Sequence, residues 1–340
     1  MIKVLKSDFE LKNMANSHFT FLEAEFDLSG SVDKIVADHR LASYEREFFS
    51  KLKYNLEKII VSPPKDLARL QQQIHPLYQS YISKKTHGLH GNKRKAAVKK
   101  ANDKIFTVFD YKSFTKKKDG KFAYQFTENM AVNVCVYCNR QYTFTLNESD
   151  GKCRPTLDHF LDKSKHPYFA LSFYNLIPSC YTCNSSLKNQ KKFTIKDNLH
   201  PYSHSMFEVL EFSIDINNVD FVDGSKKDFE IFLKESKHCR DSDLLSRAKK
   251  NAEAFKLQEL YRMHKDYASE IIVKSYYYDS SRIDELFAFK TATGKKLFES
   301  RAEVLEFALG NYISEKKLGK RVLSKFTRDI AFDLGLDKLI

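Results

Sequence analysis

The 340-residue sequence lacks any apolar run near the length needed to cross a bilayer, which argues against a membrane-spanning helix. Its first residues, MIKVLKSDFELKNMAN, lack the apolar stretch of a secretory signal. It also has no internal repeat and no low-complexity tract. With 42% hydrophobic and 14% aromatic residues, the chain has enough apolar material for a sizeable core. Together these features favour a soluble cytoplasmic protein with no membrane partner.

The charge balance of the chain is basic. Lysine and arginine number 57 against 44 aspartate and glutamate residues, a formal net charge of +13 at pH 7. This excess favours a polyanionic partner, because each phosphate that a basic side chain neutralises releases condensed counterions. The alternative is a lysine-rich surface that only keeps the protein soluble.

Both ends of the chain show helical patterns. Apolar residues recur at helical spacing over residues 41–60, SPPK at 62–65 ends that helix, and a second amphipathic segment covers 67–83. Further on, FEVLEFSIDINNVDFV alternates apolar and polar residues about Asn217-Asn218, which predicts a small hairpin. Helical spacing then returns to the end of the chain. We therefore expect a helical region over 1–130, a small module over 131–200, and a hairpin followed by helices over 201–340.

Four of the six cysteines form two Cys-x-x-Cys pairs, Cys135 with Cys138 and Cys180 with Cys183. In a cytosolic chain this spacing indicates a metal site rather than disulfides. Four thiolates in tetrahedral geometry suit Zn²⁺ and leave no coordination position open for a substrate. We therefore expect a structural zinc that stabilises the module. The alternative is two unrelated redox or buried cysteine pairs.

The segment between the cysteine pairs also has the pattern of a hairpin. QYTFTL alternates like a strand, NESDGK is typical of a turn, and TLDHF is the predicted return strand.

Polar residues suited to a second metal lie between and just beyond the cysteine pairs. Mg²⁺ prefers oxygen ligands and needs only one or two from the protein, which the Asp158 carboxylate and the Asn184 amide can supply. The imidazole of His159 is the usual kind of base for activating water. Because neighbouring residues on a strand project to opposite sides, a distortion such as a bulge is needed to bring Asp158 and His159 to one site.

This pattern resembles the HNH, or ββα-metal, endonuclease superfamily, in its zinc-stapled branch with paired Cys-x-x-Cys motifs. In that family an Asp-His dipeptide ends the first strand, an asparagine lies in the hairpin loop, and a histidine or asparagine opens the helix. The corresponding residues are Asp158-His159, Asn175 and Asn184. The resemblance implies that His159 is the general base and that Asp158 and Asn184 hold a catalytic Mg²⁺ or Mn²⁺. It further implies that Asn175 positions the base or braces the loop.

The resemblance covers about residues 133–200, and Asn184 stands where many relatives have histidine. It implies an α+β fold with mostly α-helical flanks around a central ββα-metal (HNH) module at 131–200, which carries the four-cysteine structural zinc. The wider phrase DHFLDKSKHPYFALSFYNLIPSCYTCN, followed by HPY, is similar to the HNH subunits of bacterial anti-phage systems such as Septu and its retron-linked relatives.

The resemblance implies an effector endonuclease acting on DNA, with RNA left open, and an ATPase subunit as partner. Basic side chains near the expected site are suited to binding phosphates without reading bases, namely Lys163, Lys165, Lys188, Lys191 and Lys192. Lys188, one helical turn after Asn184, is expected to face the same groove. The alternative is a non-catalytic, zinc-stabilised subunit that binds nucleic acid or a protein partner.

Overall fold

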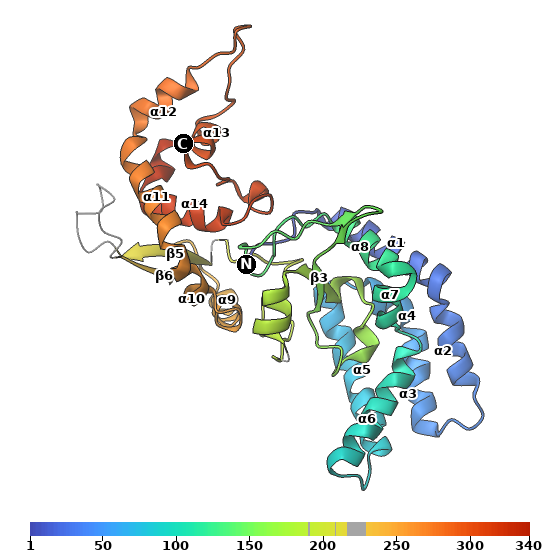
Figure 1. Ribbon diagram of the computed structural model, residues 1–340. Helices are drawn as coiled ribbons and strands as arrows, with labels where there is room; N and C mark the ends of the chain where they lie inside the picture. The colour runs from blue at the N-terminus through green and yellow to red at the C-terminus, as the bar shows by residue number, and fades with distance from the viewer. Residues whose placement is uncertain (190, 208, 216–228) are drawn as a thin grey trace.

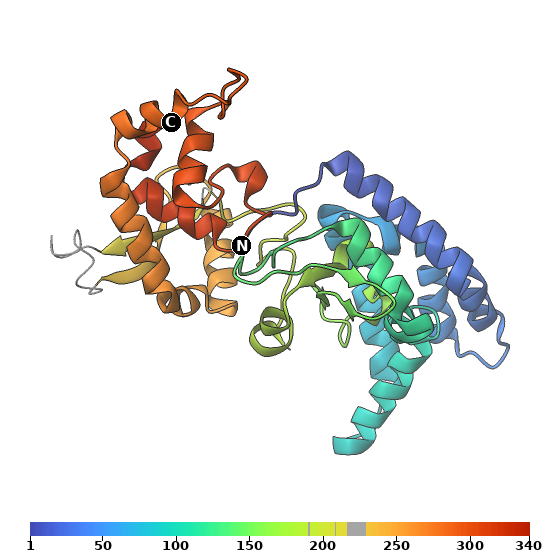
Figure 2. The ribbon, with the colours of Figure 1, turned by 45° about the horizontal axis from the view of Figure 1, so that its top comes forward.

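Helices predominate in the structure, and the strands form small two-stranded antiparallel sheets, so the fold is α+β as predicted. It is a computed structural model that describes residues 1–189, 191–207, 209–215 and 229–340. Figures 1 and 2 show an amino-terminal helical part and a carboxy-terminal part on either side of the cysteine-rich centre. No helix in these ranges is both long and apolar enough to cross a membrane.

The amino-terminal part is built from helices whose ends follow from local sequence. Ser7 caps the first helix, because its hydroxyl accepts from the Glu10 backbone N–H at 3.2 Å while the Glu10 carboxylate accepts from the Ser7 N–H at 2.7 Å. The helices predicted over 41–60 and 67–83 are confirmed, the first being interrupted at Asn55. The helices are α1 (Asp8–Phe26), α2 (Leu28–Ala37), α3 (Ser43–Tyr54), α4 (Leu56–Val61), α5 (Pro64–Lys85), α6 (Gly91–Phe106), α7 (Tyr111–Lys116) and α8 (Lys121–Met130).

The centre contains two short antiparallel pairs, β1 (Leu146–Asn147) with β2 (Lys152–Cys153), and β3 (Thr156–His159) with β4 (Leu176–Ser179). The predicted pairing of QYTFTL with TLDHF is therefore wrong. The buried strand β3 pairs with the fully buried LIPS segment of β4, whereas β1 is exposed. A buried strand needs an apolar partner, and β4 provides one. The π-helical segment η4 (Thr182–Lys188) follows β4, so the chain order is strand, strand, helical turn.

The carboxy-terminal part begins with the antiparallel pair β5 (Leu210–Asp215) and β6 (Glu230–Glu235). The predicted turn at Asn217-Asn218 and its return strand lie outside the described residues. The remaining elements are helical: α9 (Ser242–Ala254), α10 (Leu257–Tyr261), the short 3-10 turn η6 (Arg262–His264), α11 (Lys265–Tyr277), α12 (Ser280–Phe287), α13 (Arg301–Leu309) and α14 (Ser324–Asp333).

The described part of the chain contains two hydrophobic cores. Buried side chains of the cysteine-rich centre, such as Phe169 and Leu176, belong to the same core as the amino-terminal Phe48. The second core lies in the carboxy-terminal part and includes Phe212 and Phe326. The centre is thus packed into the amino-terminal helices and does not rely on a core of its own.

The carboxy-terminal part is attached directly to the first cysteine pair. The Asn139 side chain donates to the Leu318 carbonyl oxygen at 3.1 Å, and the Asn139 carbonyl accepts from the Leu323 N–H at 2.7 Å. The Tyr261 hydroxyl donates to the Cys138 carbonyl at 2.6 Å. These contacts fix the position of the second core relative to the cysteine-rich centre.

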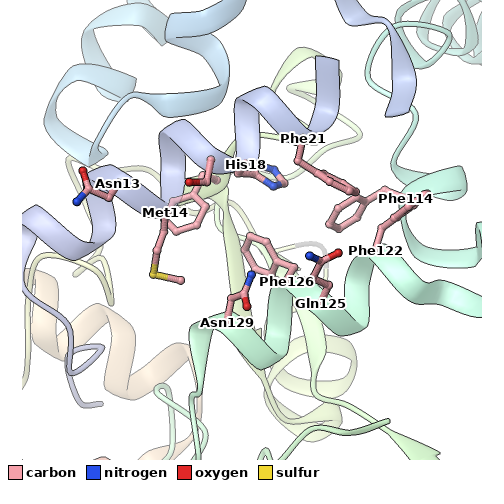
Figure 3. A pocket seen from close by; sticks show the side chains of 11 residues that line it. Asn13, Met14, His18, Phe21, Phe114, Phe122, Gln125, Phe126 and Asn129 are labelled. Carbon is pink, nitrogen blue, oxygen red and sulfur yellow. The ribbon is translucent and has the colours of Figure 1, made fainter. Parts of the chain in front are cut away.

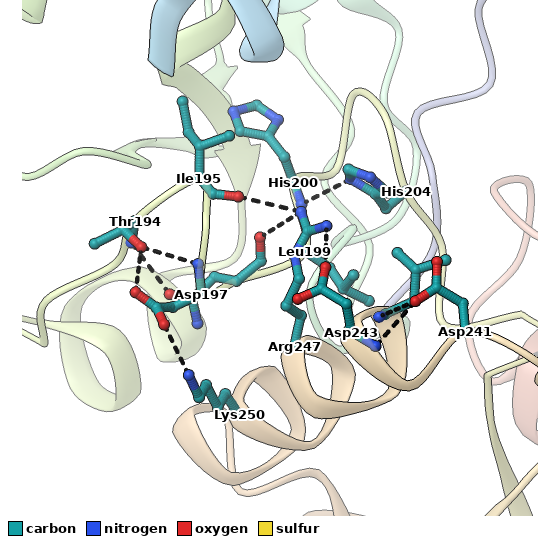
Figure 4. Close-up of polar contacts among 12 residues, drawn as sticks. Thr194, Ile195, Asp197, Leu199, His200, His204, Asp241, Asp243, Arg247 and Lys250 are labelled. Atoms are coloured by element: carbon teal, nitrogen blue, oxygen red, sulfur yellow. Dashed lines mark hydrogen bonds and ion pairs between the residues drawn. The ribbon is translucent and has the colours of Figure 1, made fainter. Parts of the chain in front are cut away.

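Helix α9 is joined to the segment after η4 by charged side chains (Figure 4). Arg247 donates to the carbonyl oxygens of Ile195 and Asn198 at 3.2 and 3.1 Å, and Lys250 pairs with Asp197 at 2.8 Å. The guanidinium thus satisfies backbone acceptors that no regular ladder reaches.

An apolar cavity of about 430 Å³ lies between α1 and α8. Figure 3 shows Phe21, Phe122 and Phe126 around it, with His18 projecting from α1. His18 Nε2 bonds to the carbonyl oxygen of Leu171 at 3.0 Å, and burial lowers the pKa of His18 to about 4. Asp158, His159 and Asn184 do not line this cavity.

Candidate metal and catalytic site

The four cysteines of the two Cys-x-x-Cys pairs come together as predicted. All four are buried, and their sulfur atoms lie within 4.8 Å of one another. Two thiolates bound to one Zn²⁺ at about 2.3 Å in tetrahedral geometry stand about 3.8 Å apart. The Sγ atoms of Cys138 and Cys180 are 3.9 Å apart, which fits that geometry. The group could therefore hold a structural metal ion such as zinc.

Backbone groups around the sulfur atoms support this assignment. The Arg140 N–H points at the Cys138 sulfur and the Cys183 N–H at the Cys180 sulfur, both at 3.4 Å. Such N–H groups stabilise negative charge on sulfur, as metal-bound thiolates require. The cluster joins the segment before β1 to the segment after β4, so it fixes the place of η4 beside β3.

A second, polar cavity of about 430 Å³ opens where β3 ends. Asp158, His159 and Asn184 all line it, so Asn184 meets the adjacent residues Asp158 and His159, which are distant from it in the sequence, at one place. The register of β3 with β4 is regular, Asp158 opposite Ile177 and His159 opposite Leu176, so the expected bulge is absent. His159 is the last residue of β3. At the end of a strand, side chains from both faces of the β3–β4 pair can reach the same cavity.

His159 is oriented by the loop between β3 and β4. Its Nε2 lies 3.0 Å from the Ala170 carbonyl oxygen, which can only accept, so Nε2 carries the proton and Nδ1 keeps a lone pair. The ring also meets the Tyr111 ring edge-on, with 4.4 Å between centroids. Burial, followed by the nearby Lys163 ammonium, holds the pKa of His159 well below its usual range. The imidazole is thus neutral and can accept a proton at Nδ1.

Asp158 is held by two donors from different elements. Tyr137, between the first two cysteines, donates its hydroxyl to Oδ2 at 2.6 Å. The Lys188 ammonium lies 2.8 Å from both carboxylate oxygens. Both members of this ion pair are almost fully buried.

The placement of Lys188 corrects the expectation that it faces a phosphate. Only 2% of the residue is exposed, and its ammonium also donates to the His159 carbonyl oxygen at 2.5 Å. The reason is the wide turn of η4. The Asn184 carbonyl accepts from the Asn189 N–H at 2.9 Å, an i→i+5 bond, so residue 188 does not lie one regular turn above residue 184.

Asn175 is a brace for the loop and does not line the cavity. Its side chain is fully buried, accepts from the Leu161 N–H at 2.7 Å, and donates to the carbonyl oxygens of Leu161 and Phe169 at 3.1 and 3.0 Å. These bonds fix the loop next to Ala170, the residue that orients His159. Of the two roles that the resemblance implied, positioning or bracing, the geometry corresponds to bracing the loop that positions His159.

No protein-family model, curated protein or solved structure matches this chain.

Asn184 is positioned by the cysteine cluster, since it directly follows Cys183 and its backbone N–H donates to the Cys180 carbonyl oxygen at 3.1 Å. Within the described ranges, its side-chain amide has no hydrogen-bond partner. The amide is partly exposed at the cavity and could serve as an oxygen ligand for a hard cation.

The remaining basic residues predicted to bind phosphates do not lie together. Lys163 lines the cavity with its ammonium 4.2 Å from the centre of the Tyr111 ring. Lys191 and Lys192 line a separate hollow beside α9. Lys165 is exposed and lines neither.

Three contributors to the site were missed in the sequence. Arg154 and Tyr111 line the cavity, and Tyr137 bonds to Asp158. A signal existed for Tyr137 because it lies inside a Cys-x-x-Cys pair. Tyr111 lies in α7, which precedes β3 by many residues, and no spacing rule connects the two.

Proposed function

We propose that this protein is a metal-dependent endonuclease of the HNH type that hydrolyses phosphodiester bonds in DNA. The observation that carries the proposal is the meeting of Asp158, His159 and Asn184 in one polar cavity beside a four-cysteine cluster. A neutral imidazole with a free Nδ1, a carboxylate and an amide oxygen are the groups that metal-assisted hydrolysis requires. The net charge of +13 supports a polyanionic substrate.

The residues present fit a catalytic Mg²⁺ or Mn²⁺ through two oxygen donors. A carboxylate offers about four lone-pair positions, and hydrogen bonds from the described residues to Asp158 use three of them, which leaves one on Oδ1. The Asn184 amide oxygen supplies the second donor. When bound, the cation would supply positive charge to the phosphate and leaving-group oxygens.

The chain's own residues then divide the remaining work. His159 would accept a proton from the attacking water at Nδ1 while its Nε2–H stays on the Ala170 carbonyl. Lys163 and Arg154, at the cavity wall, would hold the phosphate in place. Asn175 and the cysteine cluster would keep these groups in position.

Cleavage of supercoiled plasmid by the zinc-loaded protein with Mg²⁺ or Mn²⁺ tests the proposal. Wild-type protein should nick or linearise the plasmid, Asp158→Ala should be inactive, and His90→Ala, an exposed histidine at the start of α6, should match wild type. Equal cleavage by wild type and Asp158→Ala would refute the assignment. The assay is run with and without an ATPase encoded beside the gene, since the resemblance to anti-phage systems suggests a cytoplasmic effector that works with one.

One observation favours a second function, a non-catalytic zinc-stabilised subunit that binds nucleic acid or a partner. The Asp158 carboxylate already has a buried counter-ion in Lys188, as a purely structural ion pair would. This alternative predicts that Asp158→Ala and His159→Ala leave biological activity unchanged. Only substitution of the cysteines, such as Cys183→Ser, would then abolish it.

A further inference from the structure

The Lys188 ammonium has an oxygen acceptor for each of its three N–H groups. Its three N–H groups face Asp158 Oδ1 at 2.8 Å, Asp158 Oδ2 at 2.8 Å and the His159 carbonyl oxygen at 2.5 Å. Both side chains are about 95% or more buried. A lysine ammonium has three donors, so the group is fully satisfied inside the protein.

These acceptors include the carboxylate that the proposed function assigns to the divalent cation. A cation bound to the remaining lone pair on Oδ1 would lie close to the ammonium that contacts the same oxygen. Charges repel strongly at such distances where solvent is excluded, so the ammonium weakens the attraction of Asp158 for a dication. Asn184 brings a dipole but no charge to compensate.

We propose that Lys188 sets the divalent-cation affinity of the Asp158 site, keeping it low until a phosphodiester enters the cavity. This inference rests on the proposed function. In the free protein the carboxylate is balanced by the ammonium, and the pair contributes no net charge to bind a dication. A substrate phosphate adds one negative charge at the cavity, and the cation is then bound jointly by phosphate, Asp158 and Asn184.

A titration of the zinc-loaded protein with Mn²⁺ in the absence of DNA tests the inference. Electron paramagnetic resonance measures the free Mn²⁺ and so gives the affinity. Lys188→Met removes the ammonium and should bind Mn²⁺ at least about tenfold more tightly than wild type. Lys188→Arg keeps the charge and should bind as weakly as wild type. Lys196→Met, which changes an exposed lysine that follows the same segment, is the matched control and should also match wild type. The double variant Asp158→Asn/Lys188→Met should lose the tight binding.

Lys188→Met leaves a buried carboxylate without its counter-ion and is expected to be destabilised. Thermal unfolding is therefore measured with and without Mn²⁺, and the cation should raise the melting temperature of Lys188→Met more than that of wild type. If Lys188→Met cannot be purified, a variant that keeps Lys188 still decides the question. Weak Mn²⁺ binding that becomes at least about tenfold tighter when duplex DNA is added to His159→Ala protein supports the inference.

Three results would overturn it: equal or weaker Mn²⁺ binding by folded Lys188→Met, micromolar Mn²⁺ binding by wild-type protein without DNA, or no binding at Asp158 in any variant. The failure of the proposed function is seen separately, as plasmid cleavage that does not depend on Asp158. If cleavage requires Asp158 but the Mn²⁺ affinity does not depend on Lys188, the proposed function stands and only this inference is refuted.

Discussion

Asn175 provides a stability test whose size follows from the structure. Its side chain is fully buried and makes three hydrogen bonds, to the Leu161 N–H, the Leu161 carbonyl and the Phe169 carbonyl. Asn175→Ala would leave the Leu161 N–H and the Leu161 carbonyl without partners, whereas the Phe169 carbonyl would still accept from the Ser172 N–H at 3.2 Å. A buried polar group that loses its partner costs about 1–3 kcal/mol. Taking about 1–2 kcal/mol for each of the two Leu161 groups, we expect a loss of about 2–4 kcal/mol in the free energy of unfolding.

Asn175→Asp separates the lost hydrogen bonds from the lost volume. The aspartate keeps the shape and can still accept from the Leu161 N–H, but it has no N–H for the two carbonyls. We expect it to be destabilised at least as much as Asn175→Ala. Urea unfolding of the zinc-loaded variants measures both effects.

Asn129→Ala serves as the control, because Asn129 is exposed near the end of α8. Its free energy of unfolding should change by less than about 0.5 kcal/mol. If both Asn175 variants lie within about 1 kcal/mol of this control, the bracing role is refuted.

Two further predictions concern the metal and the pH. Purified wild-type protein should contain one zinc per chain by mass spectrometry under native conditions. Cys183→Ser should lose the metal and unfold at a lower temperature. Full stability of the metal-free protein would contradict this prediction. His18 has a pKa of about 4 in the folded protein against 6.5 ordinarily, so the unfolded chain binds more protons between these values. The contribution of His18 to the free energy of unfolding is complete above pH 6.5 and falls by about 2–3 kcal/mol by pH 4.5. His18→Gln, which can still donate to the Leu171 carbonyl, should reduce the acid destabilisation by that amount in urea titrations, whereas substitution of the exposed His87 should not.

The metal cluster and the helix boundaries could be predicted because short-range rules govern them. Two residues between cysteines allow both sulfurs of a pair to reach one ion, and the structure brings the two pairs together. Proline at 63 and 64 ends one helix and begins the next, and α4 and α5 meet there.

The parts that could not be predicted depend on tertiary packing. The predicted strand partner of β3 is wrong. QYTFTL alternates as a strand does, but the buried strand β3 pairs with the fully buried LIPS segment, which has no alternation. The predicted place of Lys188 is wrong because a regular helix has 3.6 residues per turn, whereas η4 has i→i+5 hydrogen bonds. Only the folded structure shows that this residue turns inward to Asp158.

The central claim is that His159, oriented by the Ala170 carbonyl, acts as the base in a cavity shared with Asp158 and Asn184. The most direct test is the rate of plasmid cleavage by His159→Ala relative to wild type, on preparations with equal zinc content and equal unfolding midpoints. Loss of a positioned general base should lower the rate by about 100-fold or more. A His159→Ala protein that cleaves at the wild-type rate would contradict the account.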